Sequence, residues 1–302
     1  MKENVNPFLA IKANYIQMNP AMKRIADVLL ENPPKRGGYT IGMLAEKSGV
    51  SNATVTRFVR ALGFENYKTF LRAIQESFED ERKGEKGLSS GQAVLYAGGF
   101  PNSRDAESVC RYVIGSEVEM LNDTLSLLDF ELMEKVAEMI LEARQVLFMG
   151  EGHSFLAAQS ACLRFRMLGV LCNCFGDFQN MVSGVGMARP GDLVVGISNM
   201  GYSSPVTESL RHANERGIQT VAITGVKGSP VNQAADISIM TGFNYGSFSN
   251  QNQSTCYEPG SENMPQYSVI DSLYLMCVMR KDDSFLEQYY NTLALVDEKR
   301  LK

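Results

Sequence analysis

The sequence of 302 residues has only two histidines, and its six cysteines include no Cys-x-x-Cys pair. Protein zinc sites are built from closely spaced Cys and His, so a zinc finger and a zinc hydrolase are excluded, and we expect no metal or cofactor. We expect the cysteines to be reduced thiols in the core. They are Cys110, Cys162, Cys172, Cys174, Cys256 and Cys277.

Long apolar stretches are also missing. No segment approaches 18 consecutive apolar residues, and the N-terminal sequence lacks the apolar core of a signal peptide. The composition, 44% hydrophobic and 21% charged, is close to the average of compact proteins and excludes a collagen-like or wholly disordered chain. We therefore expect a cytoplasmic protein with no membrane partner.

Motifs of nucleotide and ester chemistry are absent too. The sequence has no GxxxxGK[ST] and no GxSxG, which argues against a P-loop ATPase and an α/β-hydrolase. The turn Gly150-Glu151-Gly152 lacks the third glycine of a dinucleotide site, and the strand ending at Phe175 leads to Gly176-Asp177 rather than to a clear ribose-binding acid.

Charge is distributed unevenly. Residues 1–86 carry 14 basic and 10 acidic side chains, a net charge of +4, whereas residues 87–302 carry −9. Within 21–72 there are nine basic and four acidic residues. A basic end on an acidic body indicates a nucleic-acid partner at the N-terminal end and a different partner elsewhere.

The composition divides the chain into a domain at 1–80, a linker at 81–104 and a second domain at 105–302. The linker follows from the charged and Gly/Ser-containing run ESFEDERKGEKGLSSGQ at 76–92, which cannot form a core. A second polar stretch at 243–267 interrupts the C-terminal domain, and loops of that length are usually functional or mobile.

Residues 21–80 have apolar side chains at helical spacing, which predicts a helical bundle. Within it, residues 40–64 have the pattern of a helix–turn–helix, with Gly49 in the turn and a second helix from about Asn52 to Leu62. The polar side chains of this second helix are candidates for phosphate and base contacts. They are Ser51, Asn52, Thr54, Thr56, Arg57 and Arg60. The alternative is an ordinary helical hairpin with a solvated basic face.

The C-terminal domain alternates apolar strands with helices, which predicts a doubly wound α/β fold with a parallel sheet. Two helical segments at 105–128 and 130–143 come first, the second with Asp129 at its N-terminus. The predicted strands are residues 146–150, 170–175, 193–198, 220–224 and 237–240.

Two turns rich in Gly and Ser follow two of these strands, at Gly150–Ser154 and Ser198–Ser204. In a sheet of order 2-1-3-4-5 the two strands flank the topological switch point, where open α/β sheets bind ligands. Backbone N–H groups and hydroxyls there can hold an anion. The candidate ligand-binding residues are Gly152, His153, Ser154, Ser198, Asn199, Gly201 and Ser203. A lone GxGxS is a weak signal, because it also occurs in tight connections. His153 can contact a ligand there, but an exposed loop histidine is more often inert. Glu258 and Glu262 in the long polar stretch could supply a general base, but acids in such a loop are usually solvated.

The segment SNATVTRFVRALGFENYKTF resembles the helix–turn–helix of the RpiR family of bacterial transcriptional regulators. GEGHS, DLVVGISNMGYSSPVTESLRHANERGIQTVAITG and SPVNQAAD resemble the sugar isomerase (SIS) domain that these regulators carry. The resemblance implies a regulator, not an enzyme, that binds an operator in duplex DNA. Its SIS domain would sense a phosphosugar or related metabolite, and the chain would form a homodimer or homotetramer.

The resemblance also assigns residues to the phosphate. In SIS proteins the serine of the first turn and a Ser-x-Ser-Gly-x-Thr turn hold it, which places it on Ser154, Ser198, Asn199, Gly201 and Ser203. Met200 stands where the family has serine, and a thioether cannot donate a hydrogen bond, so the effector can differ from a standard sugar 6-phosphate. Two alternatives remain: a SIS-type phosphosugar isomerase with an accessory helical domain, and a ligand-free scaffold that serves only dimerisation.

Overall fold

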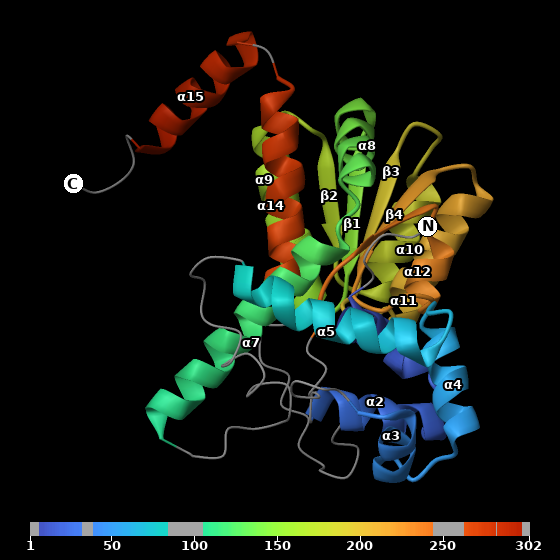
Figure 1. Cartoon of the computed structure of the whole chain (residues 1–302). Coiled ribbons are helices and arrows are strands. Elements are labelled where there is room, and N and C mark those ends of the chain that lie inside the picture. Colours follow the sequence, from blue (N-terminus) through green and yellow to red (C-terminus); the bar gives the residue numbers. More distant parts are fainter. Residues whose placement is uncertain (1–5, 32–38, 84–104, 244–262, 282, 298–302) are drawn as a thin grey trace. The chain divides into compact units, whose positions relative to one another are not determined.

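The computed structural model describes residues 6–31, 39–83, 105–243, 263–281 and 283–297 (Figure 1). These residues form two compact units, one up to Asp123 and one from Thr124 onward. None of the described helices is long and apolar enough to cross a membrane. Glu258, Glu262 and Cys256 lie outside the described residues, as does the predicted linker from Gly84 on.

The first unit is helical, as predicted. Its elements are α1 (Pro7–Asn14), the short 3-10 helix η1 (Tyr15–Gln17), α2 (Pro20–Glu31), α3 (Ile41–Lys47), α4 (Asn52–Ala61), α5 (Tyr67–Lys83) and most of α7 (Ala106–Leu127). Phe58 and Phe70 lie fully buried at the centre of its core, with their rings edge to face. The sequence pattern did not indicate α1, because this short helix has no distinct apolar face that a helical spacing would reveal.

The helix α5 continues to Lys83, through the first residues of the charged run from which the linker is predicted. The residues of this run favour helices, and no glycine or proline occurs before Gly84. An ion pair between Arg72 and Glu76, one turn apart, adds to the helix where the run begins.

Lys12 explains why most of α7 belongs to the first unit rather than to the predicted domain at 105–302. Its ammonium lies 2.6 Å from a Glu119 carboxylate oxygen and 2.7 Å from one of Asp123, and all three side chains are largely buried. Burial alone would lower the pKa of Lys12, but the two carboxylates outweigh it and raise this pKa above its ordinary value. These ion pairs thus hold α7 against α1. The prediction of a linker at 81–104 between two domains rests on composition and stays a prediction.

The second unit is a five-stranded parallel sheet in the order β2-β1-β3-β4-β5, which confirms the predicted doubly wound fold. The strands are β1 (Val146–Gly150), β2 (Cys172–Phe175), β3 (Leu193–Ile197), β4 (Gln219–Thr224) and β5 (Ile237–Met240). The helices are α8 (Phe130–Glu142), α9 (His153–Met167), α10 (Phe178–Met187), α11 (Ser204–Glu215), α12 (Pro230–Ala234), α14 (Met264–Met279) and α15 (Asp283–Asp297). Asp129 caps α8, as predicted, by accepting from the Leu132 N–H.

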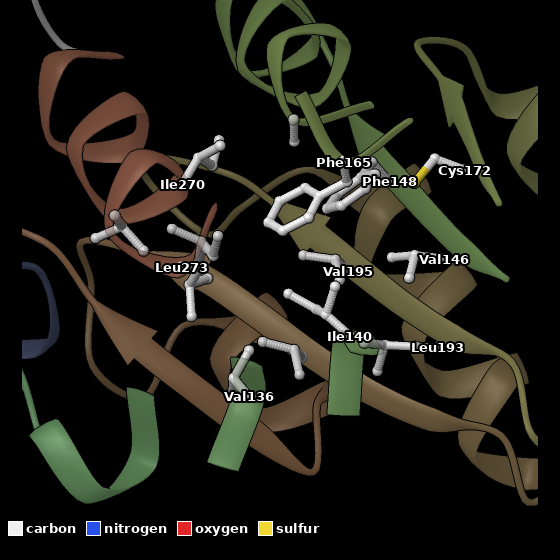
Figure 2. Packing of buried hydrophobic residues seen from close by; sticks show 14 of the residues in the cluster. Val136, Ile140, Val146, Phe148, Phe165, Cys172, Leu193, Val195, Ile270 and Leu273 are labelled. Atoms are coloured by element: carbon white, nitrogen blue, oxygen red, sulfur yellow. The ribbon is translucent and has the colours of Figure 1, made fainter. Parts of the chain in front are cut away.

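The sheet is covered on both faces, so its central strands are buried. On one face, residues of α8, α9 and α14 pack against the strands, and Figure 2 shows Phe165 over Phe148 with Ile270 and Leu273 beside them. On the other face, α10, α11 and α12 form a second core around Met181.

The described cysteines are free. Cys162, Cys172 and Cys277 are buried, as predicted, whereas Cys174 is half-buried and Cys110 is exposed on α7. Among the described residues, no three His, Cys, Asp or Glu side chains are placed to hold a metal ion.

Candidate DNA-binding helix and ligand site

The helix–turn–helix lies in the first unit, with α3 and α4 joined by a four-residue turn. Gly49 has a φ of +60°, a conformation in which a side chain would be strained. The Val50 N–H donates to the Ala45 carbonyl, which closes the end of α3. Ser51 then begins α4 by accepting a hydrogen bond from the Thr54 N–H at 3.2 Å.

One face of α4 is buried and the opposite face is exposed. Val55, Phe58 and Val59 lie in the core, while the exposed side chains include Asn52, Arg57 and Arg60. Helix spacing separates the two sets, so the guanidinium groups can reach a partner without disturbing the core.

Three of the predicted DNA-binding hydroxyls already make local hydrogen bonds. Ser51 Oγ and Thr54 Oγ1 lie 3.0 Å apart within the cap, and Thr56 Oγ1 donates to the Asn52 carbonyl. These residues can still accept a hydrogen bond, but the structure gives them a role in the helix first. Asn52, Arg57 and Arg60 are therefore the stronger candidates for base and phosphate contacts.

The two predicted ligand turns are neighbours in the second unit. Gly150 at the end of β1 is paired with Ile197 at the end of β3, so the turns that follow lie at the same edge of the sheet. The contact is direct, because Ser203 Oγ donates to Glu151 Oε2 at 2.6 Å. Because β1 and β3 flank the point where the strand order reverses, this edge is where open α/β sheets bind ligands.

The turn after β3 is held by hydrogen bonds in which its serine hydroxyls take part. The Gly201 N–H donates to Ser198 Oγ at 3.1 Å, and Ser203 Oγ caps α11 by accepting from the Val206 N–H at 3.3 Å. The Gly225 N–H donates to the Asn199 carbonyl at 2.8 Å, which joins the turn to the end of β4. Each serine oxygen thus accepts a backbone N–H, and the Ser198 hydroxyl proton remains to be donated.

Gly201 has no room for a side chain. Its φ is +72°, and a Cβ added there would lie 2.0 Å from Ser229 Oγ and 2.8 Å from Thr224 Oγ1. Ser229 cannot move easily, because it is fully buried and caps α12. The turn after β3 is therefore fixed against the ends of β4 and α12.

We expect Gly201→Ala to destabilise the second unit by about 3 kcal/mol, since the positive φ and the overpacking each cost about 1–3 kcal/mol. Gly217→Ala is the matched control, because its φ is +70° but nothing lies within 4 Å of an added Cβ. It should cost only about 1 kcal/mol. Urea unfolding of both variants measures the difference, and equal losses would show that the turn is not packed as described.

The turn after β1 leads into α9, and it is equally close-packed. A Cβ on Gly150 would lie 2.6 Å from the Ser154 carbonyl oxygen, so only glycine allows α9 to begin here. Two side chains of the α14 end also contact this first turn. Asn263 Nδ2 donates to the His153 carbonyl at 2.7 Å, and Gln266 Nε2 lies 3.3 Å from Ser154 Oγ.

The structure brings the two predicted ligand turns together. Ser154, Ser198 and Asn199 are buried, Ser203 is half-buried, and Gly152 and His153 are exposed. Their binding roles stay a prediction. Sequence reasoning did not select Glu151, although the first turn contains it. It also missed Asn263 and Gln266, for which no motif or spacing gives a signal.

Two family descriptions match the chain. Residues 6–81 match the helix-turn-helix domain of the rpiR family, and residues 139–276 match the SIS domain. The first match spans the α3–α4 pair, and the second includes both ligand turns.

Individual relatives are similar to this chain over most or all of their length. The chain is 24% identical to an HTH-type transcriptional regulator of Haemophilus influenzae, over all of both chains. It is 25% identical to the HTH-type transcriptional regulator HexR of Pseudomonas aeruginosa, over 91% of this chain and 90% of that one. Among solved structures, the Vibrio vulnificus NanR protein, complexed with ManNAc-6P, is 19% identical with a TM-score of 0.58 over 98% of this chain and 100% of that one. The sugar isomerase domain of the RpiR transcription factor from Sphaerobacter thermophilus is 24% identical with a TM-score of 0.52, over 62% of this chain and 96% of that one.

Proposed function

Because the chain belongs to the rpiR family of helix–turn–helix transcriptional regulators with a SIS domain, we propose that it binds an operator in duplex DNA and senses a phosphosugar or related anionic metabolite in the cytoplasm. The observation that carries the proposal is the pair of hydroxyl-bearing turns joined at the switch point of the sheet, in a chain that also exposes Arg57 and Arg60 on α4. Arg57 and Arg60 would contact the DNA, and Ser154, Ser198 and Ser203 would hold the metabolite.

The chemistry of the two turns supports an anionic ligand. Hydroxyl groups and the N-terminus of α9 converge there, and both favour negative charge. The Glu151 carboxylate already accepts a hydrogen bond from the Ser203 hydroxyl, so it occupies a position that a phosphate oxygen would take. We expect a binding phosphate to displace Glu151 from Ser203. A solved neighbour, the NanR protein, is complexed with a phosphosugar, ManNAc-6P.

One experiment tests both halves of the proposal. DNA fragments from around the chain's own gene are tested for band shifts, with and without each member of a panel of phosphosugars that includes ManNAc-6P. Thermal shift of the free protein against the same panel identifies ligands without DNA, since a ligand that binds only the folded state raises its melting temperature. We expect at least one fragment to bind and at least one phosphosugar to change its affinity. A protein that binds no fragment, or binds it indifferently to the panel, would refute the proposal.

A phosphosugar isomerase is the second candidate, and Glu151 is the observation that favours it. A carboxylate beside the ligand turns could act as a general base at the sugar carbons. The relatives named as transcriptional regulators and the exposed arginines of α4 favour the regulator. Incubating the protein with phosphosugars in deuterated water would decide, because isomerisation incorporates solvent deuterium at the sugar carbon and binding alone does not.

We expect Met200→Ser to strengthen phosphosugar binding by about 10-fold. Met200 is half-buried in the turn after β3, where the family has a serine. A hydrogen bond to a charged group contributes about 1.5–3 kcal/mol, and 1.4 kcal/mol corresponds to a factor of ten in affinity. Calorimetry with the phosphosugar that gives the largest thermal shift measures the change. Weaker binding would instead show that the methionine contacts the ligand, which is then less phosphate-like.

We also propose a homodimer or homotetramer, because one helix–turn–helix recognises only a half-site. The helix α14 has one side in the core, where Val269, Ile270, Leu273 and Cys277 are buried. Its other side is exposed at Leu275 and Met279, and α9 beside it exposes Leu156 and Leu163. The Arg164–Asp271 ion pair joins the two helices, so these apolar side chains are on neighbouring elements.

We expect light scattering to show a dimer or larger for the native chain, and a smaller species for the double variant Leu163→Glu/Met279→Glu. Charges on a buried apolar interface are costly, so the association should be lost. Met187→Glu, which changes an equally exposed side chain on α10, is the control and should leave the mass unchanged. A strictly monomeric native chain, with and without DNA, would contradict the proposal.

A further inference from the structure

Gln266 has a buried side-chain amide in which only one of the two polar atoms has a hydrogen-bond partner among the described residues. Its side chain is 0% exposed in the first turn of α14. Nε2 donates to Ser154 Oγ at 3.3 Å, but Oε1 has no hydrogen-bond partner among the described residues. A buried carbonyl oxygen without a partner destabilises the folded protein, so a group that completes this hydrogen bond would be bound favourably.

The place of this amide makes a ligand the fitting partner. Ser154 lies in the first turn of α9, directly after the first ligand turn, and Asn263 holds the neighbouring His153 carbonyl. Gly152 precedes the helix with a φ of +54°, and it carries no side chain that could cap the N-terminus of α9. The unpaired Oε1 and the N-terminus of α9 thus belong to the same site. Two independent observations indicate that this site lacks a ligand group: among the described residues, Oε1 has no hydrogen-bond partner, and no side chain caps α9.

The chemistry of the amide selects the kind of group that completes it. Because Ser154 Oγ accepts a hydrogen bond from Nε2, the Ser154 hydroxyl can still donate one, and a phosphate oxygen can accept it. Oε1 can only accept, and the phosphate group of a phosphosugar is mostly a dianion at neutral pH, which offers only acceptors. Phosphate therefore cannot satisfy Oε1, whereas a hydroxyl or N–H group of the same ligand can. A neutral carbonyl also adds no charge beside the anion.

We propose that Gln266 selects the effector by accepting a hydrogen bond from a hydroxyl or N–H group adjacent to the part that Ser154 binds. This rests on the proposed function, because it assigns a residue to the same site. The proposal narrows the ligand class: the effector is a phosphorylated compound with a donor group at this position, and an anion without a donor, such as sulfate, leaves Oε1 without a hydrogen bond. A buried acceptor discriminates strongly against ligands that lack the matching donor.

The test uses Gln266→Met in the full-length chain, since methionine fills a similar volume without a polar amide. Calorimetry compares ManNAc-6P, glucose 6-phosphate and ribose 5-phosphate with sulfate, a tetrahedral anion that has no O–H group at neutral pH. We expect the best of these phosphosugars to lose at least about 10-fold in affinity, while the affinity for sulfate changes by less than about twofold. Gln159→Met, at an exposed position of α9, is the matched control and should change neither.

Two outcomes would overturn the proposal. An equal loss for phosphosugar and sulfate would show that the amide only orients Ser154 or itself contacts the anion. Unchanged affinity for both would show that Oε1 takes no part in binding. If no phosphosugar binds the native chain at all, the proposed function fails before the assignment of Gln266 is reached.

A second measurement needs no variant, in case Gln266→Met does not fold. The native chain is titrated with deoxy analogues of the best-binding phosphosugar, each lacking one hydroxyl or amide group. We expect one analogue to bind at least about 10-fold more weakly than the others, and in a folded Gln266→Met protein this difference should disappear. Uniform binding across the analogues would refute the proposal.

Discussion

Replacing Arg57 and Arg60 together with alanine is expected to lower the affinity of the full-length chain for its operator by at least about 30-fold. Each arginine contributes about 1–3 kcal/mol if it contacts a base edge, and 1.4 kcal/mol corresponds to a factor of ten. Both side chains are exposed on α4, opposite the core residues Val55, Phe58 and Val59. The variant should therefore fold normally and keep the native melting temperature.

The salt dependence of binding separates the two possible roles of these arginines. If one contacts only phosphate, its alanine variant should weaken binding to all sequences and lower the salt slope by about 1. If it contacts a base, specificity at one operator position should relax instead. Arg211→Ala, at an exposed position of α11 in the second unit, is the matched control. An Arg57→Ala/Arg60→Ala protein that binds like the native chain would exclude α4 as the recognition helix.

The sheet could be predicted closely because its strands are buried on both faces and stand out as continuous apolar runs. The predicted 146–150 and 237–240 agree with β1 and β5 at both ends. The strand predicted at 170–175 begins at Cys172 instead, because the Val170 N–H closes the end of α9 on the Phe165 carbonyl. An apolar residue in a connection cannot be distinguished from a strand residue by hydropathy alone.

The ligand site could be predicted only where it is local in sequence. Ser154, Ser198 and Ser203 could be identified because they lie in Gly- and Ser-rich turns after two strands. When those strands are neighbours in a parallel sheet, the turns that follow them lie side by side. Gln266 reaches Ser154 across 112 residues of chain, and the intervening polar stretch gives no sign of it. That contact depends on how α14 packs beside α9, which no periodicity of the sequence specifies.

The double variant Ser198→Ala/Ser203→Ala is expected to lose the effect of the metabolite on DNA binding while keeping the DNA affinity of the free protein. Two hydrogen bonds to a charged ligand are removed, each contributing about 1.5–3 kcal/mol, so ligand affinity should fall at least about 100-fold. The proposed DNA contacts all lie in the first unit, which the substitutions do not touch. Band shifts across a range of metabolite concentrations measure both quantities at once.

Loss of stability must be separated from loss of binding, because both serine oxygens also accept backbone N–H groups. Removing the Ser203 cap costs about 0.5–2 kcal/mol in itself. Ser203→Asp is the control, since aspartate caps a helix as well as serine but places a second carboxylate beside Glu151, where it repels an anion. We expect this variant to keep the cap of α11, to melt somewhat below the native chain because the introduced aspartate and Glu151 repel each other, and still not to respond to the metabolite. If the double alanine variant and Ser203→Asp both respond at the native metabolite concentration, the turn after β3 does not hold the effector.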